Sequence, residues 1–483
     1  MDSPQTIKTV KINDYLFEIP KTGGMLVPGR LYVNEKILKS IIEDKSIEQV
    51  INVAHLPGIQ KYSIAMPDIH MGYGFPIGGV AATDIETGVI SPGGVGYDIN
   101  CGVRLMRTNL LEKDVRPKLK SLVEELFRTV PCGPGIGGKI KLSNNDYNDI
   151  SNKGVGWAIE KGWGIQQDLE MTEDRGYFPG SDIDNVSEKA LQRGKGQLGS
   201  LGSGNHFLEI DVVDKIDDLR VAETFGLFEG QVCVQIHCGS RGFGHQICSD
   251  YINKMLRYME REGINLPDKQ LACAHIKSRE GKEYLSAFAA AVNYAWINRQ
   301  IIMELSRKAF QNVLQIKPKD LGAELVYDVS HNIAKIEEHK IDGEIKKVCV
   351  HRKGATRSFP KNHPLIPHAY KDVGQPVMIP GDMGRSSYVL VGTQNSMDQT
   401  FGTCCHGAGR LLSRRKALRL GDVNKLLQEL SSKGIEVMAR KKRTLVEEMP
   451  DAYKKVEDVC DVVHNAGIAK KVARLRPIGV IKG

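Results

Sequence analysis

The stretch Gly202-Ser-Gly-Asn-His-Phe-Leu-Glu-Ile-Asp-Val-Val213 joins a glycine-rich turn to a run of mainly apolar residues. We predict a short β-strand over Phe207–Val213, which places His206 at the end of that strand. The loops around such strands hold most of the His and Gly residues, so we expect the chemistry to lie at strand ends. Further short strands are predicted at Gln231–His237, Leu325–Val329, Lys347–His351, Gln375–Ile379 and Ser387–Val391.

Other segments carry the apolar spacing of amphipathic helices. One such helix is predicted at Lys118–Val130. Two longer helical tracts are predicted, one made of Asp250–Arg261 and Lys282–Leu314, the other of Arg410–Leu420, Val423–Lys433 and Arg443–Val463. At 483 residues the chain exceeds the roughly 250–300 residues at which one hydrophobic core stops growing. Composition therefore leaves open several domains or one elaborate domain.

The composition indicates a folded, globular protein. Hydrophobic residues make up 41% of the chain and charged residues 26%, which excludes general disorder. The net charge of +8 favours a polyanionic partner such as nucleic acid. The segment Met1–Lys11 has no apolar core and no window approaches ~18 uninterrupted apolar residues, so we expect neither secretion nor membrane insertion. The ten cysteines lack a framework spacing and are expected to be reduced.

Several side chains that can bind metal lie among glycines or beside predicted strands. Asp98 and Cys101 are close enough in sequence for one turn to bring both to a single site. Together with His206, His237 and His331 they offer a carboxylate, a thiolate and several imidazoles, a set that binds divalent metal and in which a cysteine can bridge two ions. Each histidine taken alone is more often a hydrogen-bonded structural residue. Spacing therefore does not fix the ligand set.

His406 lies in the segment Thr403-Cys-Cys-His-Gly-Ala-Gly-Arg410, directly ahead of the predicted helix Arg410–Leu420. Free N–H groups and the positive dipole end at a helix N-terminus favour phosphate. Gly407 and Gly409 add no side-chain bulk beside the histidine. We therefore predict that His406 acts as a nucleophile toward phosphorus.

Five segments, taken together and in their order along the chain, resemble the RtcB family of RNA ligases. They are Asp98–Cys101, Gly204–Glu209, His237–Gly242, His351–Arg357 and Cys405–Arg410, and the resemblance runs from about Leu26 to Lys482. It implies an α+β fold peculiar to the family, with mixed β-sheets and surrounding helices. The chain would then form one compact catalytic domain over 1–483, with helical excursions at about 249–314 and 410–465.

The resemblance also implies roles for individual residues. Asp98, Cys101 and His206 would bind one Mn²⁺, and Cys101, His237 and His331 a second, with Cys101 bridging. His406 would carry GMP. The nucleotide-binding positions would be Asn205, Phe207, Leu208, Glu209, Asn332, Pro380, Gly381, Asp382, Met383, Ser387, Gly407, Ala408, Gly409 and Lys482. Contacts to RNA or phosphate would come from Arg241, Arg410 and Lys353.

Within the implied nucleotide site, three residues match positions with distinct tasks. Asn205 would contact the phosphates, Phe207 would pack on guanine, and Glu209 would accept the N–H groups of the base. A carboxylate acceptor suits guanine rather than adenine. One departure from the family pattern is the turn Pro380–Arg385, which carries Asp382 and Arg385 where many members have small or hydroxyl side chains.

The implied activity is GTP-dependent joining of RNA 2′,3′-cyclic phosphate or 3′-phosphate ends to 5′-hydroxyl ends. The reaction would pass through a GMP–histidine intermediate and an RNA 3′-pp-5′-G end, and would serve tRNA splicing or RNA repair. The resemblance implies two Mn²⁺ per chain, GTP as cosubstrate, and an archease-type activator of a cytoplasmic monomer. From the ligand types alone, Zn²⁺ would be accepted and outranks Mn²⁺ in raw affinity, so only the family argues for manganese.

Two other function classes fit parts of the sequence. A bimetallic phosphoesterase would use the same two-metal set to cleave RNA, but His406 and the helix predicted after it would then have no role. A non-catalytic RNA-binding protein would use the basic surface and leave the metal ligands without a role. Retention of label from α-labelled GTP would separate the ligase from both.

Overall fold

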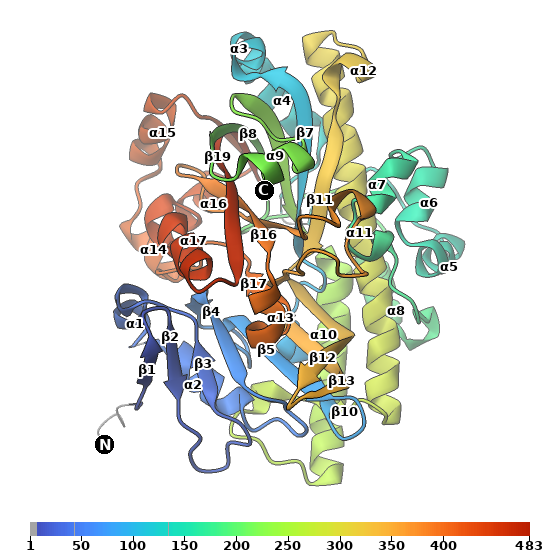
Figure 1. Cartoon of the computed structure of the whole chain (residues 1–483). Coiled ribbons are helices and arrows are strands. Elements are labelled where there is room, and N and C mark those ends of the chain that lie inside the picture. Colours follow the sequence, from blue (N-terminus) through green and yellow to red (C-terminus); the bar gives the residue numbers. More distant parts are fainter. Residues whose placement is uncertain (1–6, 43, 134) are drawn as a thin grey trace.

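The computed structural model describes residues 7–42, 44–133 and 135–483. Residues 1–6, which form the first part of the Met1–Lys11 segment, lie outside the described residues. The chain adopts an α+β fold, as predicted, in which helices pack around two large β-sheets (Figure 1). In the described part of the chain, no helix has both the length and the apolar character that crossing a bilayer requires.

An eight-stranded sheet carries most of the strands predicted from the sequence. Its order is β11 (Glu324–Ser330), β7 (Gly102–Leu111), β9 (Gln231–Cys238), β8 (Phe207–Ile216), β19 (Ala469–Lys482), β16 (Ser387–Gly392) and β15 (Pro376–Ile379), and β18 (Glu436–Ala439) pairs with β19 outside this path. Except for β18, which is parallel to β19, neighbouring strands in this sheet are antiparallel.

The antiparallel register brings the ends of four neighbouring strands together. Gly102 at the start of β7 pairs with Cys238 at the end of β9 and with Ser330 at the end of β11. Phe207 at the start of β8 pairs with His237. Because antiparallel neighbours run in opposite directions, the starts of β7 and β8 and the ends of β9 and β11 share one end of the sheet. Residues next to these positions are therefore neighbours in space.

A seven-stranded sheet lies on the other side of the site. Its order is β1 (Val10–Asn13), β2 (Leu16–Ile19), β3 (Gly29–Leu31), β4 (Ser63–His70), β5 (Ile77–Asp84), β13 (Glu344–Lys353) and β12 (Asn332–Ile341). The helices α2 (Ser46–Val53) and α17 (Val456–Asn465) pack against β4, which is buried over nearly its whole length. A two-stranded pair, β14 (Ala355–Arg357) with β17 (Thr403–Cys405), packs beside β4 and β5.

The longest helix, α11 (Arg279–Leu314), is buried on most sides. Its middle is rich in alanine and other apolar residues, and α4 (Leu119–Thr129), α10 (Arg241–Glu262) and β9 pack against it. A helix that is apolar nearly all round is expected to lie in the core. Ser278 caps its start by accepting the N–H of Gly281.

The other helices are shorter. They are α1 (Glu35–Ile41), α3 (Glu112–Val115), α5 (Asn144–Lys153), α6 (Val155–Glu160), α7 (Gln166–Glu170), α8 (Glu188–Gly194), α9 (Leu219–Phe225), α12 (Pro318–Leu321), α13 (Gln394–Thr400), α14 (Arg414–Leu420), α15 (Val423–Ser432) and α16 (Lys442–Glu447). A second two-stranded pair joins β6 (Val89–Ile90) to β10 (Ala274–His275).

The predicted strands are all present, as β8, β9, β11, β13, β15 and β16, with ends shifted by a few residues. Two helix predictions in the C-terminal part are wrong. The predicted helix Arg410–Leu420 begins only at Arg414, because Arg410 forms a bridge with Tyr453 and Ser413 caps the helix. The predicted helix Arg443–Val463 divides into α16 and α17, because the proline at position 450 interrupts the helical hydrogen bonds.

Candidate active site

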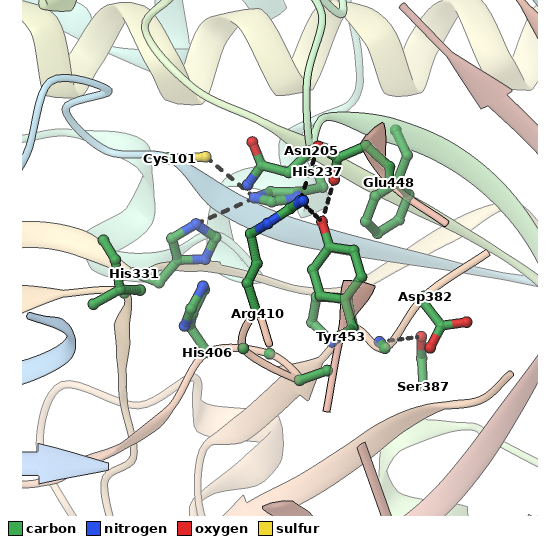
Figure 2. A pocket seen from close by; sticks show the side chains of 18 of the residues that line it. Cys101, Asn205, His237, His331, Asp382, Ser387, His406, Arg410, Glu448 and Tyr453 are labelled. Carbon is green, nitrogen blue, oxygen red and sulfur yellow. Dashed lines mark hydrogen bonds and ion pairs between the residues drawn. The ribbon is translucent and has the colours of Figure 1, made fainter. Parts of the chain in front are cut away.

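A cavity of about 260 Å³ is lined by residues of both large sheets and of the loops between them (Figure 2). His70 and Ile77 reach it from the seven-stranded sheet, and Phe207 and Lys482 from the eight-stranded sheet. Segments that are far apart in the sequence therefore meet at this cavity.

Five potential metal ligands gather at the end of the eight-stranded sheet. The Sγ atom of Cys101 lies 3.4 Å from Nε2 of His206 and 3.2 Å from Nε2 of His237. His206 Nε2 lies 2.8 Å from Asp98 Oδ2, and His237 Nε2 lies 3.2 Å from His331 Nε2. Cys101 belongs to two groups of three, one with Asp98 and His206 and one with His237 and His331. These groups contain the same residues as the two expected ligand sets, whose binding of metal stays a prediction.

The chemistry of these donors fits a divalent cation. Burial lowers the pKa values of His237 and His331 well below 6.5, so both rings are neutral and offer lone pairs. Burial raises the pKa of Cys101 to about 12, so its thiolate requires a neighbouring positive charge. Ligands at about 2.0–2.3 Å around one tetrahedral ion lie roughly 3.3–3.7 Å apart, close to the separations around Cys101.

Hydrogen bonds behind the donors orient them. His206 Nδ1 lies 3.0 Å from the carbonyl oxygen of Leu201, which fixes that nitrogen as the donor and directs Nε2 toward the other ligands. On α11, Arg299 donates to the carbonyl oxygens of Asn100 and Cys238 at 2.7 and 2.8 Å. These two residues adjoin the metal donors in sequence, so the buried guanidinium ties both turns to the core.

His406 follows β17 and lies next to His331, with ring centroids 4.9 Å apart (Figure 2). In β4, Asp68 accepts from His406 Nδ1 at 2.5 Å and from the His406 backbone N–H at 2.9 Å. The ring therefore carries its proton on Nδ1 and keeps the lone pair of Nε2 free. Gly409 has φ +73°, and a Cβ there would lie 2.2 Å from the Asp68 carbonyl oxygen. This segment passes too close to β4 for a side chain at that position.

The helix expected directly after His406 is absent. α14 begins at Arg414, and the intervening Gly407–Leu412 segment is not helical. The prediction that His406 lies just before a helix N-terminus is therefore wrong. The orientation of the ring depends instead on the Asp68 carboxylate and on the pairing of β17 with β14.

Most of the expected nucleotide-binding residues line the cavity. They are Asn205, Phe207, Glu209, Asn332, Pro380, Gly381, Asp382, Met383, Ser387, Gly407, Ala408, Gly409 and Lys482. Leu208 is fully buried and, as the alternation along β8 requires, points to the other face of the sheet.

The three cationic side chains expected to contact RNA or phosphate lie in different surroundings. Arg410 lines the cavity, whereas Arg241 and Lys353 are not part of its lining. The Nε of Arg241 donates to the Ser200 hydroxyl at 3.2 Å. Lys353 is buried and donates to the carbonyl oxygen of Tyr73, and burial lowers its pKa to about 7. Contact of these residues with RNA stays a prediction.

The two side chains expected to contact the base, Phe207 and Glu209, are buried on β8. Lys482 Nζ lies 5.4 Å from the ring centroid of Phe207. Glu209 and Asp211 are both buried and lie two residues apart on one face of β8. Burial and the neighbouring carboxylate raise the pKa of Glu209 well above 4.5, and burial raises that of Asp211 to about 6. Gln235 donates to Asp211 Oδ2 at 2.8 Å, so the carboxyl pair is held in place, and the raised pKa values favour retention of a proton by the pair.

Arg410 is held by an acidic and an aromatic side chain (Figure 2). Its Nη1 donates at 3.1 Å both to Glu448 Oε1 and to the Tyr453 hydroxyl. Arg414 approaches the same carboxylate at 3.4 Å. All four residues line the cavity, so this part of its wall combines two cations with one buried carboxylate.

Asp382 and Arg385, the two residues that differ from the family pattern, pair with each other and close the turn Pro380–Arg385. Arg385 Nε donates to Asp382 Oδ2 at 2.5 Å, and the same guanidinium donates to the Tyr453 carbonyl at 3.1 Å. The ion pair therefore fixes this turn to the segment before α17, and the backbone of Gly381 and the Ser387 side chain still face the cavity.

The sequence-based predictions miss Asp68, Glu448 and Tyr453, although each contributes to the site. Asp68 follows Pro67 within an otherwise apolar run, and a carboxylate in a buried strand is nearly always paired with something. Glu448 and Tyr453 flank Pro450, in the interruption that the single long helix prediction overlooked. Treating that proline as a helix end would have drawn attention to both residues.

A protein-family model described as "tRNA-splicing ligase RtcB" matches residues 49–483. The tRNA-splicing ligase RtcB of Archaeoglobus fulgidus is 54% identical over 475 residues, which cover 98% of both chains. The protein of the same name from Thermococcus kodakarensis is 54% identical over 474 residues, again 98% of both chains. That from Methanococcus maripaludis is 51% identical over 478 residues, 99% of both chains.

Proposed function

The chain belongs to the RtcB family of tRNA-splicing ligases, and from this premise we propose that it joins RNA ends in a GTP-dependent reaction with His406 as the nucleophile. Its substrates would be RNA 2′,3′-cyclic phosphate or 3′-phosphate ends and 5′-hydroxyl ends, from tRNA exon halves or broken RNA. The observation that carries the proposal is the position of His406, with Nδ1 on Asp68 and its ring beside the metal-donor cluster in one cavity.

In this proposal the two donor groups hold two Mn²⁺ ions. Asp98 and His206 would bind one ion, His237 and His331 the other, and Cys101 would bridge them. The ions would supply Lewis-acid polarisation of phosphoryl oxygens in the cavity. Zn²⁺ suits the same donors, so the choice of manganese rests on the family.

The nucleotide would bind along the rest of the cavity. Phe207 would pack on the guanine and the Glu209 carboxylate would accept its N–H groups, which adenine does not offer at those positions. Asn205 and Lys482 would face the phosphates, with donors supplied by the cavity-lining backbone after His406.

The proposed sequence begins with attack of His406 Nε2 on the α-phosphorus of GTP. An N–P bond forms, pyrophosphate leaves, and Asp68 stabilises the positive charge that develops on the ring. A 3′-phosphate oxygen of the RNA then displaces the histidine and takes GMP, giving a 3′-pp-5′-G end; a cyclic phosphate end is first opened by water. The 5′-hydroxyl attacks the 3′-phosphate and gives up its proton, GMP leaves, and a phosphodiester remains.

The test is covalent labelling with α-labelled and γ-labelled GTP. The protein should retain the α-label and none of the γ-label, and the bond should be labile in acid and stable in alkali, as a phosphoramidate is. His406→Ala should abolish labelling and leave metal content unchanged, because His406 belongs to neither donor group. The variant should still join RNA that already carries the 3′-pp-5′-G end.

The rival outcomes are distinct. Acid-labile GMP on the His406→Ala protein would place the nucleophile elsewhere, with His351, His245 and Lys353 as the next candidates. Cleavage of RNA without any nucleotide labelling would favour a bimetallic phosphoesterase, and binding without turnover a non-catalytic RNA-binding protein. The proposal also includes an archease-type activator, a monomeric state and a cytoplasmic location. Only the resemblance to the family supports these three.

A further inference from the structure

The edge of the seven-stranded sheet is formed by β12, which pairs with β13 on one side only. The two strands pair without a bulge from Asn332 with Lys353 to Ile341 with Glu344. The connecting residues Asp342 and Gly343 have φ values of 51° and 90°, as in a two-residue type I′ hairpin turn. In such a hairpin the closing pair exchanges both hydrogen bonds, and every second pair after it does the same.

This register decides which backbone groups of β12 face away from the sheet. Lys335 and Glu337 bond to β13, whereas Ala334, Ile336 and Glu338 direct their N–H and C=O groups outward. Within the described residues these outward groups have no hydrogen-bond partner. The strand therefore presents a row of donors and acceptors with the spacing of an open β-ladder.

A groove of about 890 Å³ runs along this edge. Four consecutive residues, Ala334–Glu337, line it. Because successive side chains point to opposite faces of a strand, a hollow lined by consecutive residues follows the edge and not one face. The unpaired backbone groups of Ile336, which is 54% exposed, thus open into the groove, whereas Ala334 is only 1% exposed and offers no open group.

Apolar side chains form much of the groove and are unusually exposed. Ile336 is 54% exposed, Leu365 52% and Tyr177 37%. The adjoining segments Phe178–Pro179 and Pro364–Pro367 contribute further apolar surface to the lining. An open strand edge with exposed apolar neighbours promotes association, and natural proteins usually cover or charge such edges.

The turn beside the groove is rigidly built. Asp174 and Arg175 both have left-handed φ values, 52° and 55°. The Asp174 carboxylate binds the Arg357 guanidinium at 2.7 Å and also pairs with Lys335 of β12. Strained backbone of this kind persists when surrounding contacts fix it, and it concentrates at binding sites. The groove is therefore preformed.

The rim carries an excess of positive charge. Arg175 and Lys282 are exposed and line the groove, and within the described residues neither forms an ion pair. The exposed carboxylate at the rim is Glu170. An occupant with acidic side chains would complement the two cations.

We propose that the β12 edge is a docking site for an extended segment of a partner protein, in which apolar side chains alternate with acidic ones. The segment would add a strand to the sheet, satisfy the outward groups of Ile336 and Glu338, and place alternate apolar side chains in the groove. RNA is disfavoured because its recognition does not use a row of peptide donors and acceptors at strand spacing.

The test uses a fluorescent heptapeptide of alternating Glu and Val, with the wild-type full-length protein, followed by anisotropy. The matched control is the same peptide N-methylated at alternate residues, which removes the donors that would face β12. We expect saturable binding of the first peptide at micromolar to millimolar concentration and at least about tenfold weaker binding of the second. Equal binding of the two peptides, or no binding of either, overturns the proposal.

A pair of protein variants tests the same contact. Ile336→Pro removes an N–H that β13 does not use, so the hairpin should survive, since edge strands tolerate proline at such positions. It should weaken peptide binding by about tenfold, while Ile336→Val retains the N–H and should bind within about twofold of wild type. Circular dichroism and the thermal midpoint show whether each variant is folded.

Hydrogen–deuterium exchange at residue resolution locates the contact if the proline variant unfolds. Peptide binding should slow exchange at Ile336 and Glu338, and leave Lys335 and Glu337 unchanged because their amides already bond to β13. Uniform protection of all four amides, displacement of the peptide by an RNA oligonucleotide, or protection by concentration-dependent dimers alone would overturn the proposal. The readouts do not involve GTP, so their outcome is independent of the proposed ligase activity.

Discussion

Two buried polar clusters lie side by side at the end of the eight-stranded sheet, and they differ in whether their polar groups are paired within the protein. In the first, Asp328 is bound by Arg104 at 2.7 Å and by both Nε and Nη2 of Arg299 at 2.9 and 2.7 Å. In the second, Cys101 Sγ lies 3.2 Å from His237 Nε2, which lies 3.2 Å from His331 Nε2, so three potential metal ligands converge. The first cluster pairs its carboxylate with guanidinium groups of the protein, whereas the ligands of the second would be paired only by a bound cation.

The first cluster also positions the second. The Arg299 guanidinium that binds Asp328 also donates to the backbone on either side of the metal donors, at Asn100 and Cys238. Structural charge pairs thus hold the potential metal ligands in place.

The largest effect is expected from Cys101→Ser. An alcohol at the bridging position is a much poorer anionic ligand than a thiolate, so the variant should lose both ions or their spacing, together with RNA joining. Metal content per chain, measured by mass spectrometry after gel filtration in Mn²⁺, checks this. Cys273→Ser, at another buried cysteine outside the donor groups, should keep the wild-type metal content. Two tightly bound equivalents on Cys101→Ser would contradict the bridging role.

A loss of stability is expected from Asp328→Ala. The change leaves Arg104 and Arg299 buried without a counter-charge, which costs about 3–5 kcal/mol of unfolding free energy. Urea unfolding of metal-free protein measures it, because the first cluster needs no ion. Metal-free Cys101→Ser should unfold within about 1 kcal/mol of metal-free wild type. A similar loss in both variants would remove the distinction between the clusters.

A smaller effect is expected from Asp68→Asn. The amide keeps the shape of the carboxylate but loses the charge that stabilises His406 when its ring becomes positive. A hydrogen bond to a charged group contributes about 1.5–3 kcal/mol, so the rate of GMP transfer to the protein should fall roughly 10–100-fold. Single-turnover labelling at saturating GTP measures this rate. A change in GTP affinity alone, with an unchanged rate, would argue against this role for Asp68.

The sequence predicts the local parts of this site better than its assembly. The strand at Phe207–Val213 and the histidine before it are predictable because turn residues and apolar runs are local signals. The meeting of Cys101 with His237 depends on the strand order β11-β7-β9-β8, which no local pattern encodes. The resemblance to a family, and not spacing, supplied the ligand sets.

The failed helix prediction shows the same limit at His406. The spacing of Arg410–Leu420 is helical, but tertiary contacts of Arg410 with Glu448 and Tyr453 hold the first residues in an extended form. The partner that orients His406 is Asp68, 338 residues away in the sequence. Contacts of that separation arise from the packing of the two sheets. The assignment of the whole chain to a single domain stays a prediction.

The smallest effect is expected at Glu209 and Asp211. These two carboxyl groups lie close together, as the potential metal ligands do. In the proposed nucleotide complex Glu209 would accept the N–H groups of guanine best when it is ionised, and its raised pKa means that the ionised form becomes populated as the pH rises. The preference of the wild-type protein for GTP over ATP should therefore increase with pH.

Asp211→Asn removes the neighbouring negative charge and offers an amide that can donate to Glu209. The pKa of Glu209 should fall, so the variant should reach its full GTP preference at lower pH, with a change of only a few-fold near neutrality. Competition binding of GTP and ATP, followed from about one pH unit below the Asp211 pKa of about 6 to about two units above it, measures this. Glu209→Ala, in contrast, should lose the preference at every pH. Identical pH profiles for wild type and Asp211→Asn would show that the two carboxyls do not share a proton, and that Glu209 recognises the base without help from Asp211.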